Sequence, residues 1–341
     1  MSAAGPSRKR ARVNSTATDD AVPLAHRAQG EETKRDQEFW FEDGNVTLIA
    51  GNFEFRVYKG VLSNRSPVFR DMFSLPQQSP STPSTCPTVH LSDSPEDVRE
   101  LLRALIPGID SSHPFSLETQ PSYQTISASI RLGHKYQLDR LVDAALAYLR
   151  RYYTTDYDTW HNIHTHCKTH PLSPVHAIGV VNLARLTGAD DILPSALYAC
   201  CTLEGPQLVE GFQREDGTPE VLSNADLARC IQGKANLTKE RVGHVVGLHR
   251  RFQSPNCKQR CSGGAVIHKI VSRIDCAIHP CAFEGWTWPP ANGPGGNFCP
   301  HCLHILNMRE HAQKQDLWNR LPELMGVMVD DWKRKEIQIF R

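Results

Sequence analysis

The sequence predicts a small α+β domain, a sheet flanked by helices, followed by a mainly α-helical region and a loop-rich cysteine module. Three observations support this fold class. Two runs of strand-forming residues meet at Gly51-Asn52, amphipathic helical spacing recurs from Lys59 onward, and six of the 11 cysteines lie between Cys257 and Cys302. A chain of 341 residues is also long enough for more than one domain.

The composition is that of an ordinary globular protein, with 40% hydrophobic and 22% charged residues. The net charge of +1 gives no overall attraction to nucleic acid or membranes. No run reaches the roughly 18 consecutive apolar residues of a membrane helix, and residues 1–13 lack the apolar core of a signal peptide. We expect a nuclear or cytoplasmic protein without membrane contact, in which clustered cysteines are metal ligands or free thiols.

Residues 1–35 are predicted to be a disordered tail, because they contain too few large apolar residues to offset the entropy of ordering. The basic run from Arg8 to Arg12 is compatible with a nuclear import signal and equally with a solvated tail.

Ordered structure is expected over 36–152, beginning with a β-hairpin. Residues 45–50 form the first strand, and in residues 53–58 apolar and charged side chains alternate, as in a half-buried strand. Helical spacing follows from Lys59, and Ser66-Pro67 is a typical N-cap with proline in the first turn. The further elements expected are a loop at 75–88, a strand at 89–91, a helix from Ser94-Pro95 to Pro107, a loop at 109–122, and helices at 123–136 and 138–152.

The segment from Asn45 to Phe73, NVTLIAGNFEFRVYKGVLSNRSPVFRDMF, resembles the opening of BTB/POZ domains without a gap. It carries a strand, a hairpin, a basic-x-x-Leu motif and then Ser-x-x-Phe-x-x-Met-Phe at the family's spacing. The resemblance extends over about residues 39–152, and the loops at 75–88 and 109–122 are similar to insertions of fungal members.

The resemblance implies a domain that assembles with other proteins and does no catalysis. Members form homodimers, bind partner peptides or dock on a cullin-type scaffold as adaptors of a ubiquitin ligase. Two positions depart from the family pattern, Asn45 in place of an acid and Tyr58 in place of histidine. Asn45 removes the ion pair that corepressor-recruiting members form with a basic residue at the place of Lys59, and Tyr58 is predicted to be a packing variant.

Residues 153–173 are predicted to be a polar linker. Metal binding is the alternative, because this segment contains several potential ligands, which are His161, His164, His166, Cys167 and His170. Residues 174–255 are predicted to be helical. They comprise a helical hairpin over 174–204 with Cys200 and Cys201 as buried apolar residues, a helix beginning at Ser223 or Asn224, a turn at Gly233, and another helix over 234–254.

Residues 256–341 contain two thiol pairs, Cys257-x3-Cys261 and Cys299-x2-Cys302. Closely spaced cysteines let two thiolates reach one ion, and a second pair completes a tetrahedron, so these four are the candidate ligands of a structural zinc ion. The alternative is ordinary cysteines in a loop-rich module. Reserve ligands are Cys276, His279, Cys281, His301 and His304.

The motifs of common enzyme classes are missing from the sequence, so no enzyme is predicted. We interpret the chain as a protein–protein adaptor that dimerises or docks on a cullin scaffold through residues 36–152, with the C-terminal half selecting partners. The rival is a nuclear transcription regulator that binds nucleic acid through the cysteine-rich segment. Residues 257–304 show no finger helix with basic base-reading positions, which disfavours the rival. Trp318 and Trp332 are expected in the core, and Trp286 and Trp288 in a packed aromatic loop.

Overall fold

The computed structural model describes residues 33–75, 86–106, 114–116, 119–166, 172–250, 253–258, 261, 282–283, 298–330 and 332. Several predictions lie outside the described residues: the tail up to residue 32 with its basic run, most of the two loops, the reserve ligands from 276 to 281, Cys167, His170 and the aromatic pair at 286 and 288. The last residues of the predicted tail, 34–35, belong to a strand. We call the described part up to residue 152 the N-terminal domain and the part from 153 onward the helical region.

A mixed four-stranded sheet forms one end of the N-terminal domain, in the order β1-β3-β2-β4. The predicted hairpin is confirmed: β2 and β3 are antiparallel, with Leu48 opposite Phe55. The outer strands are parallel to their neighbours. The strand bounds are β1 (Lys34–Trp40), β2 (Val46–Ala50), β3 (Phe53–Val57) and β4 (Thr88–Leu91).

Strand β1 was not predicted, because its buried residues, Asp36 and Phe39, are three positions apart rather than two. The Asp36 carboxylate accepts hydrogen bonds from the backbone N–H groups of Glu38 and Phe39, at 3.0 and 2.9 Å. These bonds accompany a shift in the register between β1 and β3 and break the two-residue period by which a strand is recognised in a sequence.

The predicted helices of the N-terminal domain are confirmed. Ser66 caps α2, as expected, by accepting a hydrogen bond from Phe69 N–H at 3.0 Å. Ser94 caps α3 in the same way. The helix bounds are α1 (Lys59–Arg65), α2 (Pro67–Ser74), α3 (Pro95–Leu105), α4 (Tyr123–Lys135) and α5 (Asp139–Tyr152).

The helical region begins with an element that the sequence did not predict. A helix, α6 (Tyr157–His166), occupies the segment expected to be a linker, and its Tyr157 and Trp160 are buried. The predicted helical hairpin is confirmed as α7 (Ala177–Thr187) and α8 (Leu193–Cys201), with short 3-10 turns before each helix at Pro174–His176 and Asp190–Ile192. The remaining elements are α9 (Gly205–Glu210), β5 (Phe212–Gln213), β6 (Pro219–Glu220), α10 (Asn224–Arg250), α13 (Pro300–Asn319) and α14 (Leu321–Leu324).

The turn predicted at Gly233 is wrong, since α10 runs through this residue without interruption. A Cβ atom at Gly233 would lie 3.0 Å from Cys201 Sγ and 3.1 Å from Met325 Cε. The glycine therefore allows α10 to approach α8 closely and does not end the helix.

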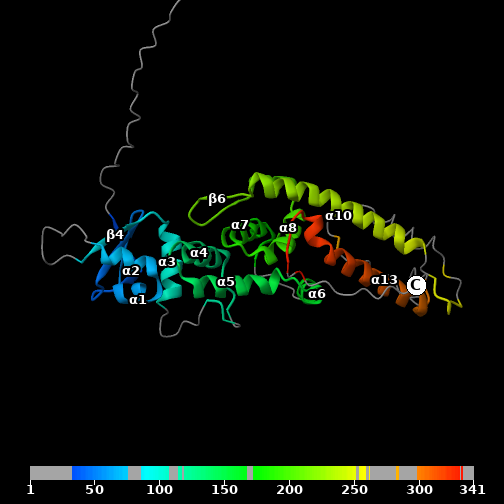
Figure 1. Cartoon of the computed structure of the whole chain (residues 1–341), viewed down its shortest axis with the longest axis horizontal. Helices are drawn as coiled ribbons and strands as arrows, with labels where there is room; N and C mark the ends of the chain where they lie inside the picture. Colours follow the sequence, from blue (N-terminus) through cyan, green and yellow to red (C-terminus); the bar gives the residue numbers. More distant parts are fainter. Residues whose placement is uncertain are drawn as a thin grey trace, which may run out of the picture.

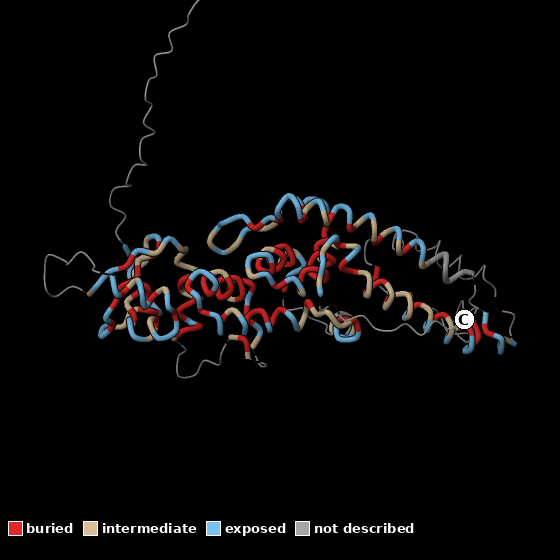
Figure 2. Tube along the Cα trace, in the orientation of Figure 1, coloured by how far each residue is buried: buried red, intermediate tan, exposed pale blue. Residues whose placement is uncertain are grey.

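The molecule is elongated. In Figure 1 the sheet with α1–α3 lies at one end, α7 and α8 lie in the middle, and α10 and α13 run side by side towards the other end. The buried apolar residues form one cluster that extends from Phe39 in the sheet to Trp332 near the C-terminus. The outward side of α10 is exposed (Figure 2). No described helix is long and apolar enough to cross a membrane.

Candidate interaction domain and metal centre

The helix pair α1–α2 packs on the sheet through apolar residues of the motif from Asn45 to Phe73. Phe55, Leu62 and Phe69 are almost fully buried. The Phe69 ring stacks on Tyr136, with ring centroids 4.4 Å apart. Ser66 adds a second link, because its hydroxyl donates to the Tyr136 carbonyl at 2.6 Å. This motif therefore joins the beginning of α2 to the end of α4.

The two departures from the family pattern have clear structural roles. The Asn45 side-chain oxygen accepts a hydrogen bond from the Lys59 backbone N–H at 2.7 Å. Lys59 Nζ donates to the Phe73 carbonyl at 3.0 Å. Tyr58 stacks on Phe41 and donates to the Asp43 carboxylate at 2.7 Å. The packing role predicted for Tyr58 is therefore confirmed.

A buried charged cluster joins the N-terminal domain to the helical region. Arg131 of α4 donates to both carboxylate oxygens of Glu220 in β6, at 2.8 and 2.7 Å. Asn182 of α7 donates to the same carboxylate at 2.5 Å. Arg214, which follows β5, lies 3.9 Å from Asp97 of α3. Because the Glu220 side chain is only 5% exposed, its ion pair is shielded from water. Loss of either partner would therefore leave a buried charge without compensation and destabilise the fold.

A cleft of about 730 Å³ opens beside this cluster, between the N-terminal domain and the β5–β6 hairpin. Its three basic side chains already face carboxylates: Arg131 pairs with Glu220, Lys135 with Asp93 and Arg214 with Asp216. Desolvation by burial raises the pKa of Asp97, which also lines this cleft. No uncompensated charge among these described residues points to a ligand.

The second link across the junction is an aromatic contact. The Tyr123 ring stacks on His176, with centroids 4.6 Å apart, and meets Phe212 edge-on at 5.2 Å. A Cβ atom at Gly179 would lie 1.8 Å from the Tyr123 hydroxyl oxygen. Only glycine therefore lets α7 approach α4 this closely.

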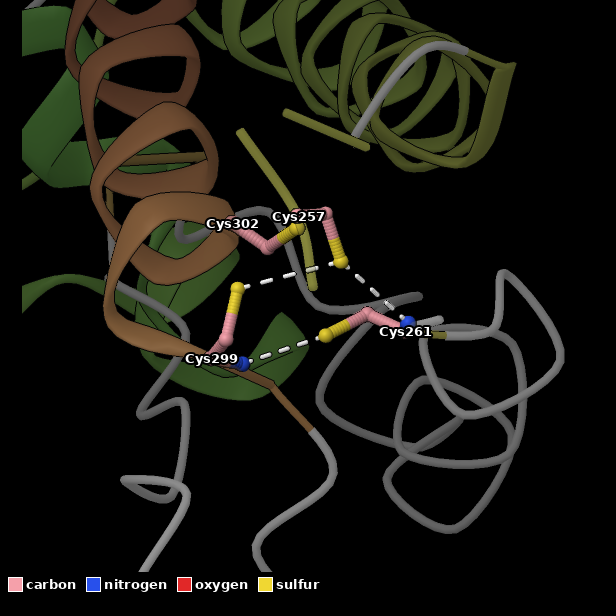
Figure 3. A group of neighbouring side chains, drawn as sticks. All are labelled: Cys257, Cys261, Cys299 and Cys302. Atoms are coloured by element: carbon pink, nitrogen blue, oxygen red, sulfur yellow. Dashed lines mark hydrogen bonds between the residues drawn. The ribbon is translucent and has the colours of Figure 1, made fainter. Parts of the chain in front are cut away.

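The four cysteines of the predicted metal site come together at the far end of the helical region. Their sulfur atoms all lie within 4.8 Å of one another. Cys299 is the N-cap of α13 and Cys302 lies in its first turn, whereas Cys257 and Cys261 follow α10 (Figure 3). Cys261, Cys299 and Cys302 are buried. The structure therefore brings together all four residues singled out from their spacing.

The chemistry of this cluster fits a soft divalent metal ion. Zinc–sulfur bonds of about 2.3 Å place the sulfurs of a tetrahedral site about 3.8 Å apart. Cys257 Sγ and Cys299 Sγ are 3.8 Å apart. A movement of about 1 Å closes the wider pairs onto one ion. All the described cysteines are free thiols, so disulfides do not compete for these sulfurs.

Backbone N–H groups point at the sulfurs, as a thiolate site requires. Cys299 N–H donates to Cys261 Sγ at 3.1 Å, and Ser254 N–H donates to Cys302 Sγ at 3.3 Å. Desolvation by burial raises the pKa of Cys302 to about 12 and also raises that of Cys261. Burial therefore favours the neutral thiols. A bound cation would reverse this preference, because metal ligation requires the deprotonated thiolate.

The other end of α13 is held by an aromatic cluster. Trp318 is fully buried and packs against Tyr157, Trp160 and Phe283. Its indole N–H donates to the Thr155 carbonyl at 2.9 Å, and the Trp332 indole N–H donates to the Trp318 carbonyl at the same distance. The predicted core role of Trp318 and Trp332 is confirmed.

Of the histidines proposed as alternative metal ligands in the segment before α7, His161 stacks on Tyr157. The side chains of His164 and His166 lie outside the described residues. The signal for α6 that sequence reasoning missed was the spacing of Tyr157 and Trp160, which lie one turn apart on the same face.

A comparison with protein-family models matches residues 35–152 to the BTB/POZ domain. Residues 35–152 are a BTB/POZ domain. The match covers the mixed sheet and helices α1–α5, the same part of the chain in which the motif from Asn45 to Phe73 folds as described above. No curated protein and no solved structure matches the chain. The BTB domain is a non-catalytic module for protein–protein interaction, so this chain has protein partners.

Proposed function

We propose that the chain is an adaptor: its BTB domain forms a homodimer or docks on a cullin-type ubiquitin ligase scaffold, and its helical region selects the partner. The observation that carries this proposal is the tight junction between the two parts. An adaptor must present its partner in a defined orientation, and a flexible linker would not do so. The ion pair between Arg131 and Glu220, with the Tyr123–Gly179 contact, supports a fixed orientation.

The second part of the proposal is that Cys257, Cys261, Cys299 and Cys302 bind one structural zinc ion. Four protein ligands leave no open position for a substrate, which is the arrangement of structural rather than catalytic zinc. Apparent binding energies of structural zinc are on the order of 10 kcal/mol or more, so one ion can organise a segment with few apolar contacts. Zinc supplies no chemistry here beyond holding the four thiolates together.

Titration calorimetry of the full chain against the N-terminal domain of a cullin tests the adaptor function. We expect binding at about micromolar affinity or tighter. The Cys299→Ser/Cys302→Ser variant should bind the cullin equally well, because both cysteines lie at the beginning of α13, and α13 is remote from the sheet and helices α1–α3 in Figure 1. A folded chain that binds no cullin would remove the scaffold part of the proposal and leave homodimerisation as its remaining basis.

The rival function, nucleic acid binding through the cysteine-rich segment, receives little support from the described residues. The exposed positions in the first turns of α13 are His301, His304, Asn307 and Met308. Base-reading helices usually present arginine, lysine, asparagine or glutamine to the major groove, with basic residues for the phosphates. Asn307 is the one such side chain among these four exposed positions, and neither arginine nor lysine is among them. We therefore retain the adaptor as the proposed function. The nuclear or cytoplasmic location and the fungal type stay predictions from the sequence.

A further inference from the structure

Helix α10 carries apolar residues on two opposite sides. Its inner side packs on α8 and α14, with Cys230 and Leu237 fully buried. Its outward side, which is exposed in Figure 2, carries Ile231 and Val242, and these residues are 60% and 48% exposed. Single exposed apolar residues are common on protein surfaces. The spacing of the outward residues therefore decides whether they form a surface of their own.

The outward residues repeat with the period of a coiled-coil seam. Exposed alanines and a half-buried threonine fill the positions between Ile231 and Val242 and one turn before them. The separations along the chain are three, four, three and four residues, which is the a and d pattern of a heptad repeat. We call this set the outer seam, and its five residues are Ala228, Ile231, Ala235, Thr238 and Val242. The Thr238 hydroxyl donates to the Lys234 carbonyl at 2.8 Å, so its polar group is satisfied within the helix.

The outer seam is shallow and short. In a coiled coil each a or d side chain enters a hole formed by four residues of the facing helix. Ala228 and Ala235 leave room in these holes for large side chains of the facing helix. The seam extends over about 21 Å at a rise of about 1.5 Å per residue, which is two heptads. It therefore fits a helix with large apolar a and d residues, in a contact small enough to be reversible.

The positions that flank the outer seam carry positive charge and no acid. These are the e and g positions of the heptad, which are Leu227, Gln232, Lys234, Lys239 and Arg241. The acids of α10 lie elsewhere on the helix, where Asp226 pairs with Arg185 of α7 and Glu240 pairs with Arg320, both at 2.8 Å. Charges at e and g decide which helices pair with each other. The outer seam therefore favours a helix with acids at these positions.

A second copy of α10 does not meet this requirement. In a parallel pair, each g residue faces the e residue five positions further along the other helix. Lys234 of one copy would then face Lys239 of the other. An antiparallel pair brings g to g and e to e, and none of these positions supplies an acid. Like charges repel in both arrangements, so self-pairing through the seam is disfavoured.

We propose that the outer seam docks an amphipathic helix of a partner protein, with large apolar residues at a and d and acidic residues at e and g. This inference rests on the proposed function, because it names the class of partner that the helical region selects. The inner side attaches α10 to the body of the molecule. Lys234 Nζ donates to the Leu203 carbonyl at 2.5 Å, and Asn236 Nδ2 donates to the Leu324 carbonyl at 3.0 Å. A helix bound on the seam is thereby held in a defined orientation to the BTB domain.

Fluorescence anisotropy of a labelled synthetic peptide, titrated with the full chain, tests the seam. The acidic peptide has three heptads with leucine at a and d and glutamate at e and g, and a matched basic peptide has lysine at e and g. We expect a dissociation constant on the order of 10–100 μM for the acidic peptide, and binding at least about tenfold weaker for the basic one. Ile231→Ser should weaken binding of the acidic peptide roughly tenfold. Val209→Ser is the control, because Val209 is also 60% exposed but lies in α9, and it should leave binding unchanged.

The Lys239→Glu variant tests the charge preference at an exposed position of the rim. It should weaken binding of the acidic peptide and tighten binding of the basic peptide, each by roughly threefold. Equal affinities of the two peptides for the unmodified chain would overturn the acidic character of the partner.

Three further outcomes decide the site itself. A folded chain that does not bind the acidic peptide, or binds it equally well after Ile231→Ser, would overturn the seam. Self-association of the full chain that Ile231→Ser abolishes would assign the seam to a second copy and overturn the proposal. Cullin titration of the same samples separates the two proposals. Cullin binding without peptide binding removes the seam alone, whereas peptide binding without cullin binding supports the seam and removes the scaffold part of the proposed function.

Discussion

Arg131 of α4 and Glu220 of β6 form an ion pair at 2.7 Å that joins two parts of the chain 89 residues apart. The pair fixes the BTB domain to the helical region, and several measurable consequences follow from its burial and from that of its neighbours.

Removing one partner of this pair should destabilise the chain strongly. Arg131→Ala leaves the Glu220 carboxylate, 5% exposed, without its main cation, so we expect the free energy of unfolding to fall by about 2–4 kcal/mol. Denaturant unfolding followed by circular dichroism measures this change.

The matched control for Arg131→Ala is Arg150→Ala. Arg150 pairs with Asp191 across the same junction, but their side chains are 44% and 29% exposed. Its removal should cost less than about 1 kcal/mol. Equal losses in the two variants would show that burial does not decide the strength of this junction.

Gly179→Ala should also weaken the junction. The added methyl group would overlap the Tyr123 hydroxyl, and such overpacking typically costs about 1–3 kcal/mol. The double variant Gly179→Ala/Tyr123→Leu should recover part of the loss, because leucine removes the overlapping ring atoms. Gly60→Ala is the control: its Cβ would meet nothing within 4 Å, so stability should not fall. A stable Gly179→Ala chain would contradict the observed approach of α7 to α4.

The Ser66→Ala substitution should lower the free energy of unfolding more than the loss of an exposed N-cap residue does. Ser66 is fully buried and makes two hydrogen bonds, one from Phe69 N–H and one to the Tyr136 carbonyl. Loss of both should lower the free energy of unfolding by about 2–3 kcal/mol. Ser122 caps α4 at an exposed position, and Ser122→Ala should cost about 1 kcal/mol. If thermal unfolding shows no difference between the two, the buried link to Tyr136 has no energetic role.

Stability should fall on mild acidification, because desolvation by burial lowers the pKa of His176. The unfolded chain takes up a proton near the ordinary histidine value of about 6.5, whereas the folded chain resists protonation. The contribution of neutral His176 to the free energy of unfolding is therefore present above that pH and is lost as the pH falls below it. His244 changes in the same direction, also by desolvation.

The measurement compares unfolding free energies at about pH 7.5 and about pH 5.5 in the unmodified chain and in His176→Gln. Glutamine cannot gain a proton, so the variant should lose less stability between these two pH values. An identical pH dependence in both chains would exclude His176 as a source of the effect.

The sequence predicted local features well and distant contacts poorly. The cap at Ser66 was predictable because its partner Phe69 is three residues away, but nothing local indicates the bond to Tyr136. Gly233 was interpreted as a turn because its packing partners, Cys201 and Met325, are remote in sequence. The segment of α6 was interpreted as a linker because its histidines obscured the apolar spacing of Tyr157 and Trp160.

The cysteine cluster was the opposite case. Ligand pairs with short spacing constrain each other locally, so the set Cys257, Cys261, Cys299 and Cys302 could be assembled from the sequence alone.

Sedimentation equilibrium of the full chain, alone and mixed with the N-terminal domain of a cullin, tests the adaptor account most directly. The account predicts a chain that dimerises at micromolar concentration, forms a complex with the cullin, or does both. A folded chain that remains monomeric at every concentration and forms no complex would contradict it.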